Sequence, residues 1–273
     1  MPRQAICCFY LLLFLFSNNC FSQNENQCKI RFDGDYIKNY WKSGVTTITQ
    51  VKSFETKEWI AVGAVATSTA LIYVYDKTIF SFFDRQFTDK QAKNSTNITD
   101  AFGNGFVALP LFAVMYIVGN NEKNCHLRKT SLVGLQAFVF SAGSSLILKE
   151  LTKRSRPSQN ENPHIWQGPF GNNHRSAFPS AHTAIAFSVA TVFSEMYRES
   201  VWVGITAYTL AGLTGIGRLV KGKHWASDVV AGAALGYFIG KGVVLFNKKQ
   251  QQKNPFSLKT SFNENGFGIA LTF

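Results

Sequence analysis

The chain is poor in charged residues: Asp, Glu, Lys and Arg make up only 16% of its 273 residues, against about 25% in typical soluble domains. It also has no long stripe of basic side chains, although its net charge is +12. The basic residues are scattered between apolar segments, which argues against nucleic acid and favours anionic lipid or phosphorylated substrates as partners. The mean hydropathy of −0.01 is low for a chain made mostly of spanning helices. A membrane-embedded protein and a peripheral one therefore both fit the composition.

Cysteine is scarce, and no C-x-x-C or Cys/His spacing is present among the five cysteines. We therefore expect no metal site and no cofactor. Three of the cysteines precede residue 23, which leaves Cys28 and Cys125. In an oxidising compartment these two can form a disulfide, and two unpaired thiols are the alternative.

The N-terminus has the layout of a secretory signal peptide. A short basic start precedes an apolar run over residues 5–16, which is too short to span a membrane comfortably. The small residue Ser22 then precedes the polar stretch QNENQ. We expect export with cleavage after Ser22, and a retained membrane anchor is the alternative. The predicted organisation is a signal peptide (1–22), a polar lead-in (23–57), a helical domain (58–247) and a basic tail (248–273).

Strand-like alternation of apolar and polar residues is absent from the middle of the chain, which instead contains long apolar runs rich in Ala, Gly, Ser and Val. Such runs predict helices, and their small residues allow the helices to pack closely. The expected fold is all-α, a six-helix bundle embedded in or lying at a membrane. Two β-prone runs around an Asn/Gly turn add a possible C-terminal hairpin. The six segments are 59–75, 102–119, 131–148, 179–197, 201–217 and 228–246, separated by charged loops.

Cations and histidines cluster at the ends of these segments, in KELTKRSRP, FPSAH and RLVKGKHWASD. If a helix begins near residue 223, His224 and Asp228 share a face, so the carboxylate can hold one ring nitrogen and leave the other free. Pro179 suits the first turn of a helix, whose unpaired N–H groups favour an anion. Arg and Lys side chains add the groups that hold phosphate oxygens. Together these residues predict phosphoryl transfer without a metal.

The ordered set K-x6-RP, PS-x-H and R-x5-H-x3-D resembles the signature of the type 2 phosphatidic acid phosphatase superfamily, over about residues 100 to 246. The resemblance implies an all-α bundle with its site at the helix ends and a covalent phosphohistidine. It implies that His224 is the nucleophile, that Asp228 orients it, and that His182 protonates the leaving alcohol and then activates water. The implied phosphate-binding groups are Lys149, Arg156, Ser180, the Ala181 N–H and Arg218.

Two positions depart from the family pattern. Gly217 stands where the family usually has serine, and Ala181 stands where it usually has glycine. The first change removes one hydroxyl near the phosphate, and the second replaces one small residue with another. Neither deletes an essential group, so we expect an active enzyme.

The predicted function is metal-independent hydrolysis of a phosphorylated lipid, such as phosphatidic acid, a polyprenyl diphosphate or a phosphorylated lipid A. A broad-specificity periplasmic acid phosphatase is the alternative, followed by a vanadate-dependent haloperoxidase and a non-catalytic membrane protein. We expect the protein in the inner membrane or periplasm, with its site outside the cytoplasm. With residue 23 outside and six spanning segments, however, Lys149 would lie inside. Either 59–75 does not span and the N-terminal segment stays as an anchor, or the bundle is peripheral.

Overall fold

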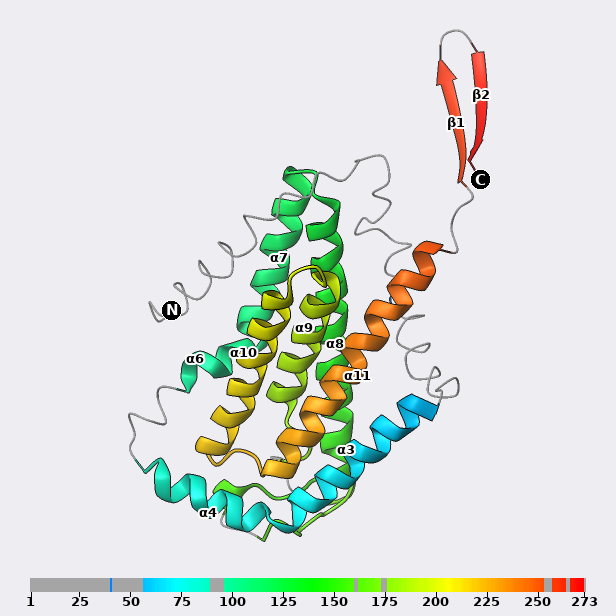
Figure 1. Ribbon diagram of the computed structural model, residues 1–273. Helices are drawn as coiled ribbons and strands as arrows, with labels where there is room; N and C mark the ends of the chain where they lie inside the picture. The colour runs from blue at the N-terminus through cyan, green and yellow to red at the C-terminus, as the bar shows by residue number, and fades with distance from the viewer. Residues whose placement is uncertain are drawn as a thin grey trace.

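The computed structural model describes Tyr40 and residues 56–88, 96–159, 162–172, 176–252, 257–263 and 266–272. The expected signal peptide and Cys28 lie outside these residues. Each of the six predicted apolar segments is a helix, which confirms the all-α bundle (Figure 1). The helices are α3 (Thr56–Val74), α7 (Gly105–Asn121), α8 (Cys125–Thr152), α9 (Ala181–Met196), α10 (Val201–Val220) and α11 (Ala226–Gln252).

Helix α9 occupies the centre of the bundle and packs against α8, α10 and α11. Its contact with α11 is close because glycines of α11 face it. A Cβ atom at Gly232 would lie 2.6 Å from the Ser180 carbonyl oxygen, and one at Gly236 would collide with the Ala184 carbonyl. The close approach brings the first turns of both helices together, so that the Ser180 N–H donates to the Asp228 carbonyl across 3.0 Å.

The connection between α3 and α7 contains two helices where the sequence predicts a charged loop. Helix α4 (Asp76–Gln86) bends away from α3 by 64°, and helix α6 (Asn97–Phe102) follows it. The prediction was wrong here because the apolar residues of α4 are few and lie on one face. Among them, Phe80 packs edge-on against Trp225 with ring centroids 5.6 Å apart. The α4 helix therefore lies across one end of the bundle, as Figure 1 shows.

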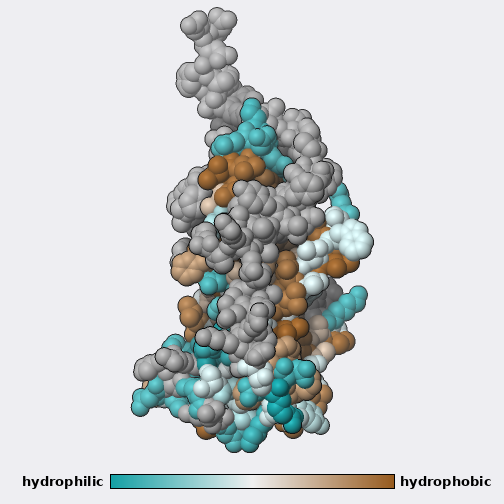
Figure 2. All heavy atoms as spheres, turned by 90° about the vertical axis from the view of Figure 1, so that its left-hand side faces the viewer, coloured by the Kyte–Doolittle hydropathy of each residue, from teal (hydrophilic) through white to brown (hydrophobic). Residues whose placement is uncertain are grey.

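Several helices are long and apolar enough to cross a membrane. Within the described residues these are α8, α10 and residues 226–249 of α11, or four spans if bent α3 and α4 form one together. Helix α7 is apolar but shorter. Large apolar side chains are exposed along the bundle, including Phe106 at 85% and Trp202 at 76%. Figure 2 shows apolar side chains along the middle of one face and hydrophilic ones at its lower end.

The tail forms the hairpin that its two β-prone runs predict. Strand β1 (Ser257–Asn263) pairs antiparallel with β2 (Gly266–Thr272), in a register that places Asn263 opposite Gly266. Asn263 and Gly266, at the two ends of the NENG stretch, thus form the last pair of the hairpin.

Candidate active site

The ends of four helices meet at one end of the bundle, the lower end in Figure 1. This end receives the last turns of α8 and α10 and the first turns of α9 and α11. The structure brings all the predicted site residues to this end of the bundle: Lys149, Arg156, Ser180, Ala181, His182, Arg218, His224 and Asp228. The three stretches that are separate in the sequence therefore form one site.

A sharp reversal after α8 folds the following loop under the bundle. Lys153 ends α8 in the left-handed conformation, with φ of 43°. The next residue, Arg154, accepts a 2.7 Å hydrogen bond at its carbonyl from the Ala177 N–H. The short 3-10 helix η3 (Pro157–Gln159) lies between Arg154 and Ala177 in the chain. The loop thus returns to the bundle with the Ala177 carbonyl aimed at the start of α11.

His224 lies in the short connection between α10 and α11 and is only 2% exposed. Its Nδ1 is 2.6 Å from the Ala177 carbonyl oxygen. A carbonyl oxygen can only accept, so Nδ1 carries the proton and Nε2 keeps its lone pair. Burial, followed by the positive charges of Lys149, Arg218 and Arg156, holds the pKa of His224 well below its ordinary value. The ring is therefore neutral and available as a nucleophile.

Asp228, the predicted orienting residue, is a more distant partner of the ring. Its Oδ2 is 3.8 Å from His224 Nδ1 and accepts a 2.8 Å hydrogen bond from the Trp225 N–H. The carboxylate therefore holds the backbone next to the histidine, while the Ala177 carbonyl holds the ring itself. The sequence pattern singles out the carboxylate because it is a side chain, whereas a backbone carbonyl gives no sequence signal.

Three cations surround the histidine. Lys149 Nζ donates to the Ser176 carbonyl at 2.8 Å and to the Ala177 carbonyl at 3.3 Å. Arg156 donates to the same Ser176 carbonyl from Nε and Nη2. The backbone of one loop thus holds two basic side chains near the ring. Three positive charges beside a neutral imidazole are suited to a phosphate group. Within the described ranges, no three His, Cys, Asp or Glu side chains gather as metal ligands.

Arg218 is partly neutralised by a carboxylate that the sequence pattern does not single out. Its Nη1 lies 2.9 Å from Asp100 Oδ2, and Lys221 binds the same oxygen. Burial alone would raise the pKa of Asp100, but hydrogen bonding from Lys221 and the charge of Arg218 outweigh it and lower that pKa. Arg218 Nε, by contrast, is buried without a hydrogen-bond acceptor among the described residues. That N–H remains available to a phosphate oxygen.

The first turn of α9 closes another side of the site. Ser180 is buried, and its hydroxyl pairs with Thr183 Oγ1 at 2.8 Å. When Thr183 is the donor of this pair, the Ser180 hydroxyl proton is still able to bind a phosphate oxygen. The N–H groups of the first helical turn lack acceptors within the helix, which leaves Ala181 and His182 as anion donors. Gly103 allows α6 to cover this turn, because a Cβ there would lie 2.5 Å from the His182 carbonyl oxygen.

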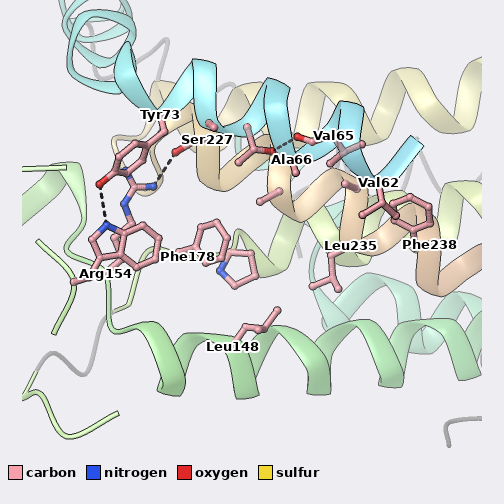
Figure 3. Close-up of a pocket in the computed structure, with 16 residues that line it drawn as sticks. Val62, Val65, Ala66, Tyr73, Leu148, Arg154, Phe178, Ser227, Leu235 and Phe238 are labelled. Carbon is pink, nitrogen blue, oxygen red and sulfur yellow. Dashed lines mark hydrogen bonds between the residues drawn. The ribbon is translucent and has the colours of Figure 1, made fainter. Parts of the chain in front are cut away.

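An apolar groove of about 620 Å³ runs beside the site between α3, α8 and α11. Figure 3 shows Val62, Val65 and Ala66 of α3 on one side and Leu148 of α8 opposite them. Phe178 and Pro179 also line the groove and immediately precede Ser180. Leu148 likewise precedes Lys149. The groove and the predicted phosphate-binding groups thus share two short backbone segments.

The chain is similar to a known superfamily and to several known proteins. Residues 131–252 match the PAP2 superfamily. Over 67 residues the chain is 48% identical to a lipid A 1-phosphatase of Porphyromonas gingivalis, covering 24% of this chain and 15% of that protein. Over 151 residues it is 31% identical to a lipid A 4'-phosphatase of Bacteroides thetaiotaomicron, covering 51% of this chain and 64% of that protein.

The chain thus spans less than two thirds of the length of either curated relative. Among solved structures, it is similar to a transmembrane PAP2 type phosphatidylglycerolphosphate phosphatase of Bacillus subtilis. The TM-score is 0.47 at 19% identity, and the match covers 79% of this chain and 95% of that one.

Proposed function

We propose that this chain, whose residues 131–252 match the PAP2 superfamily, is a phosphatase that releases phosphate from a monoester or diphosphate group of a membrane lipid. The observation that carries the proposal is the neutral, buried His224 held by the Ala177 carbonyl among Lys149, Arg156 and Arg218. Two relatives are named lipid A phosphatases, and lipid A is the substrate to test first.

The proposed reaction has two steps. His182 takes up a proton when the phosphate group binds. His224 Nε2 then attacks phosphorus, the N–P bond forms and the P–O bond to the lipid breaks, while His182 gives that proton to the leaving oxygen. Water then attacks phosphorus, its proton passes to His182, and the N–P bond breaks to release inorganic phosphate. The cations and the first turn of α9 stabilise the negative charge on the phosphoryl oxygens in both steps.

The test is phosphate release by the detergent-solubilised protein, with chelator, on lipid A, phosphatidic acid, a polyprenyl diphosphate and a soluble aryl phosphate. We expect release to persist in chelator and to be fastest on a lipid. Fast release from the aryl phosphate with none from the lipids would instead identify a broad-specificity acid phosphatase. No release from any substrate would contradict the proposed function.

The apolar groove supports a lipid substrate, because it offers an acyl chain a dry surface beside the phosphate site. Filling the groove with Ala66→Trp or Ala234→Trp is expected to raise the KM for a long-chain lipid phosphate about tenfold. Excluding two methylenes from the groove loses about 1.6 kcal/mol of binding free energy. The KM for the soluble aryl phosphate should not change. Ala64→Trp, on the same helix but outside the groove, is the matched control. Equal KM values for lipid in all three variants would contradict an acyl-chain site.

In this proposal the active site lies on the extracytoplasmic side of the membrane. At the opposite end of the bundle, α8 begins with Arg128 and Lys129, and α11 ends with Lys248 and Lys249. The positive-inside rule would place that end in the cytoplasm. Cys125, at the same end, is disulfide-bonded. This bond argues that the Cys125 end lies outside the cytoplasm, because disulfides persist in oxidising compartments.

Labelling of single cysteines in intact bacterial cells decides between these orientations. Lys223→Cys marks the site end and Lys249→Cys the opposite end, each with the five native cysteines replaced by serine. We expect a membrane-impermeant maleimide to label only Lys223→Cys. Labelling of Lys249→Cys alone would place the site in the cytoplasm, and labelling of both would show that the bundle does not span.

A further inference from the structure

Arg154 is the most completely buried cation of the described residues, and the proposed chemistry does not use it. Its guanidinium is 0% exposed and lies among three aromatic rings. The guanidinium carbon is 4.8 Å from the Tyr73 ring centroid, 4.9 Å from that of Trp166 and 5.8 Å from that of Trp225. Figure 3 shows its side chain extending toward Ser227 at the start of α11. A buried charge of this kind requires partners.

The partners of Arg154 come from three separate parts of the chain. Nη2 donates to Asp76 Oδ2 at 2.6 Å, and Nη1 donates to Asp228 and to the Ser227 hydroxyl. Nε donates to the Pro163 carbonyl at 2.9 Å. Asp76 in turn accepts from the Ser227 N–H at 2.9 Å, at the start of α11. One guanidinium thus joins the α3–α4 corner, the loop after α8 and the first turn of α11.

Two chains of hydrogen bonds lead from Arg154 to the ring of His224. In the first, the guanidinium binds Asp228, whose other oxygen binds the N–H of Trp225, the residue after the histidine. In the second, the Arg154 carbonyl accepts from the Ala177 N–H, and the Ala177 carbonyl binds His224 Nδ1. The same residue therefore supports both the backbone and the ring of the histidine.

We propose that Arg154 is a positioning residue, whose forked guanidinium fixes His224 in the Nδ1-protonated form with Nε2 aimed at the substrate. The inference rests on the proposed function for its catalytic consequence, whereas its structural consequence can be measured separately. Lysine cannot replace arginine in this role, because an ammonium group cannot bind two carboxylates in the fixed planar geometry of the guanidinium.

The kinetic test compares the wild-type protein with Arg154→Lys and Arg154→Met. A displacement of about 1 Å in a reacting group costs about 100-fold, so we expect kcat to fall about 100-fold in both variants. We expect KM, and inhibition by inorganic phosphate, to stay within about threefold, because Lys149, Arg156 and Arg218 remain. Arg198→Met is the matched control, since Arg198 is 60% exposed and paired with Glu195. The proposal would be overturned if Arg154→Lys kept the wild-type kcat. It would also be overturned if both variants lost phosphate binding and folding in parallel.

A second measurement does not depend on turnover. The nitrogen NMR signals of His224, assigned by their loss in His224→Ala, report which ring nitrogen carries the proton. We expect one Nδ1-protonated form in the wild-type protein and a mixture of forms in Arg154→Met. An unchanged ring signal in Arg154→Met would overturn the inference even if the enzyme is active. An inactive wild-type protein whose ring signal depends on Arg154 would contradict only the proposed function.

Discussion

Replacing His224 with alanine is expected to lower kcat for phosphate release by about 10,000-fold or more, the largest effect of any single substitution considered. Loss of a nucleophile removes the covalent route altogether and leaves only the binding and charge stabilisation of the remaining site. The cations would still hold the phosphate, because Lys149 and Arg156 are bound to the loop backbone and not to the histidine. Inhibition by inorganic phosphate should therefore survive in the variant, and kcat should not.

His126→Ala is the control for this experiment. His126 is on α8, and about 35 Å of helix separates it from Lys149, so its loss should leave kcat unchanged. A transient, acid-labile and base-stable phosphoenzyme should form in wild-type protein and be absent from His224→Ala. Retention of that species in the variant would assign the nucleophile to another residue.

The pH dependence follows from the environment of His224. Its pKa is lowered by burial and by three nearby cations, so the ring stays neutral at pH values below the usual 6.5 of histidine. The acid-side fall in kcat/KM, which reports the free enzyme, is therefore expected below pH 6.5. It should have the same midpoint on lipid and aryl phosphates if it belongs to the enzyme.

The long apolar runs allowed all six bundle helices to be predicted, because an uninterrupted run of that length has few other stable structures. Helix α8 begins six residues before its predicted start at 131 because its first turns, from Cys125, contain polar and charged residues. The amphipathic α4 was missed for the opposite reason, since only part of one face is apolar and the segment resembles a charged loop.

The site could be predicted where its residues belong to short sequence motifs. It could not be predicted where it depends on contacts between residues that are far apart in the sequence. Arg154 and Asp76 are 78 positions apart, and no local spacing connects them. Asp100 is likewise 118 positions from Arg218. A single Asp at the corner between an apolar and an amphipathic helix is a weak signal that could have drawn attention to Asp76. The Ala177 carbonyl leaves no sequence trace at all.

Replacing His182 with alanine should lower kcat by about 1,000-fold on a lipid phosphate, a typical loss for general acid–base catalysis. In the proposed mechanism His182 supplies the proton that the departing oxygen needs, so the loss should depend on the leaving group. An alkoxide from a lipid is a poor leaving group without that proton. A nitrophenolate is stable without it, so the first step on a nitrophenyl phosphate should be nearly as fast in the variant as in the wild-type protein.

The second step gives the sharper test. In the proposed mechanism, hydrolysis of the phosphohistidine requires a base for water, and His182, in the first turn of α9, has that role. With nitrophenyl phosphate, His182→Ala should therefore release one rapid equivalent of nitrophenol and then stall with the acid-labile phosphoenzyme accumulated. Thr183→Ala, which removes only the partner of the Ser180 hydroxyl, should turn over without such a burst. If His182→Ala slows the burst and the steady state equally on both substrates, the residue binds the phosphate and does not transfer the proton.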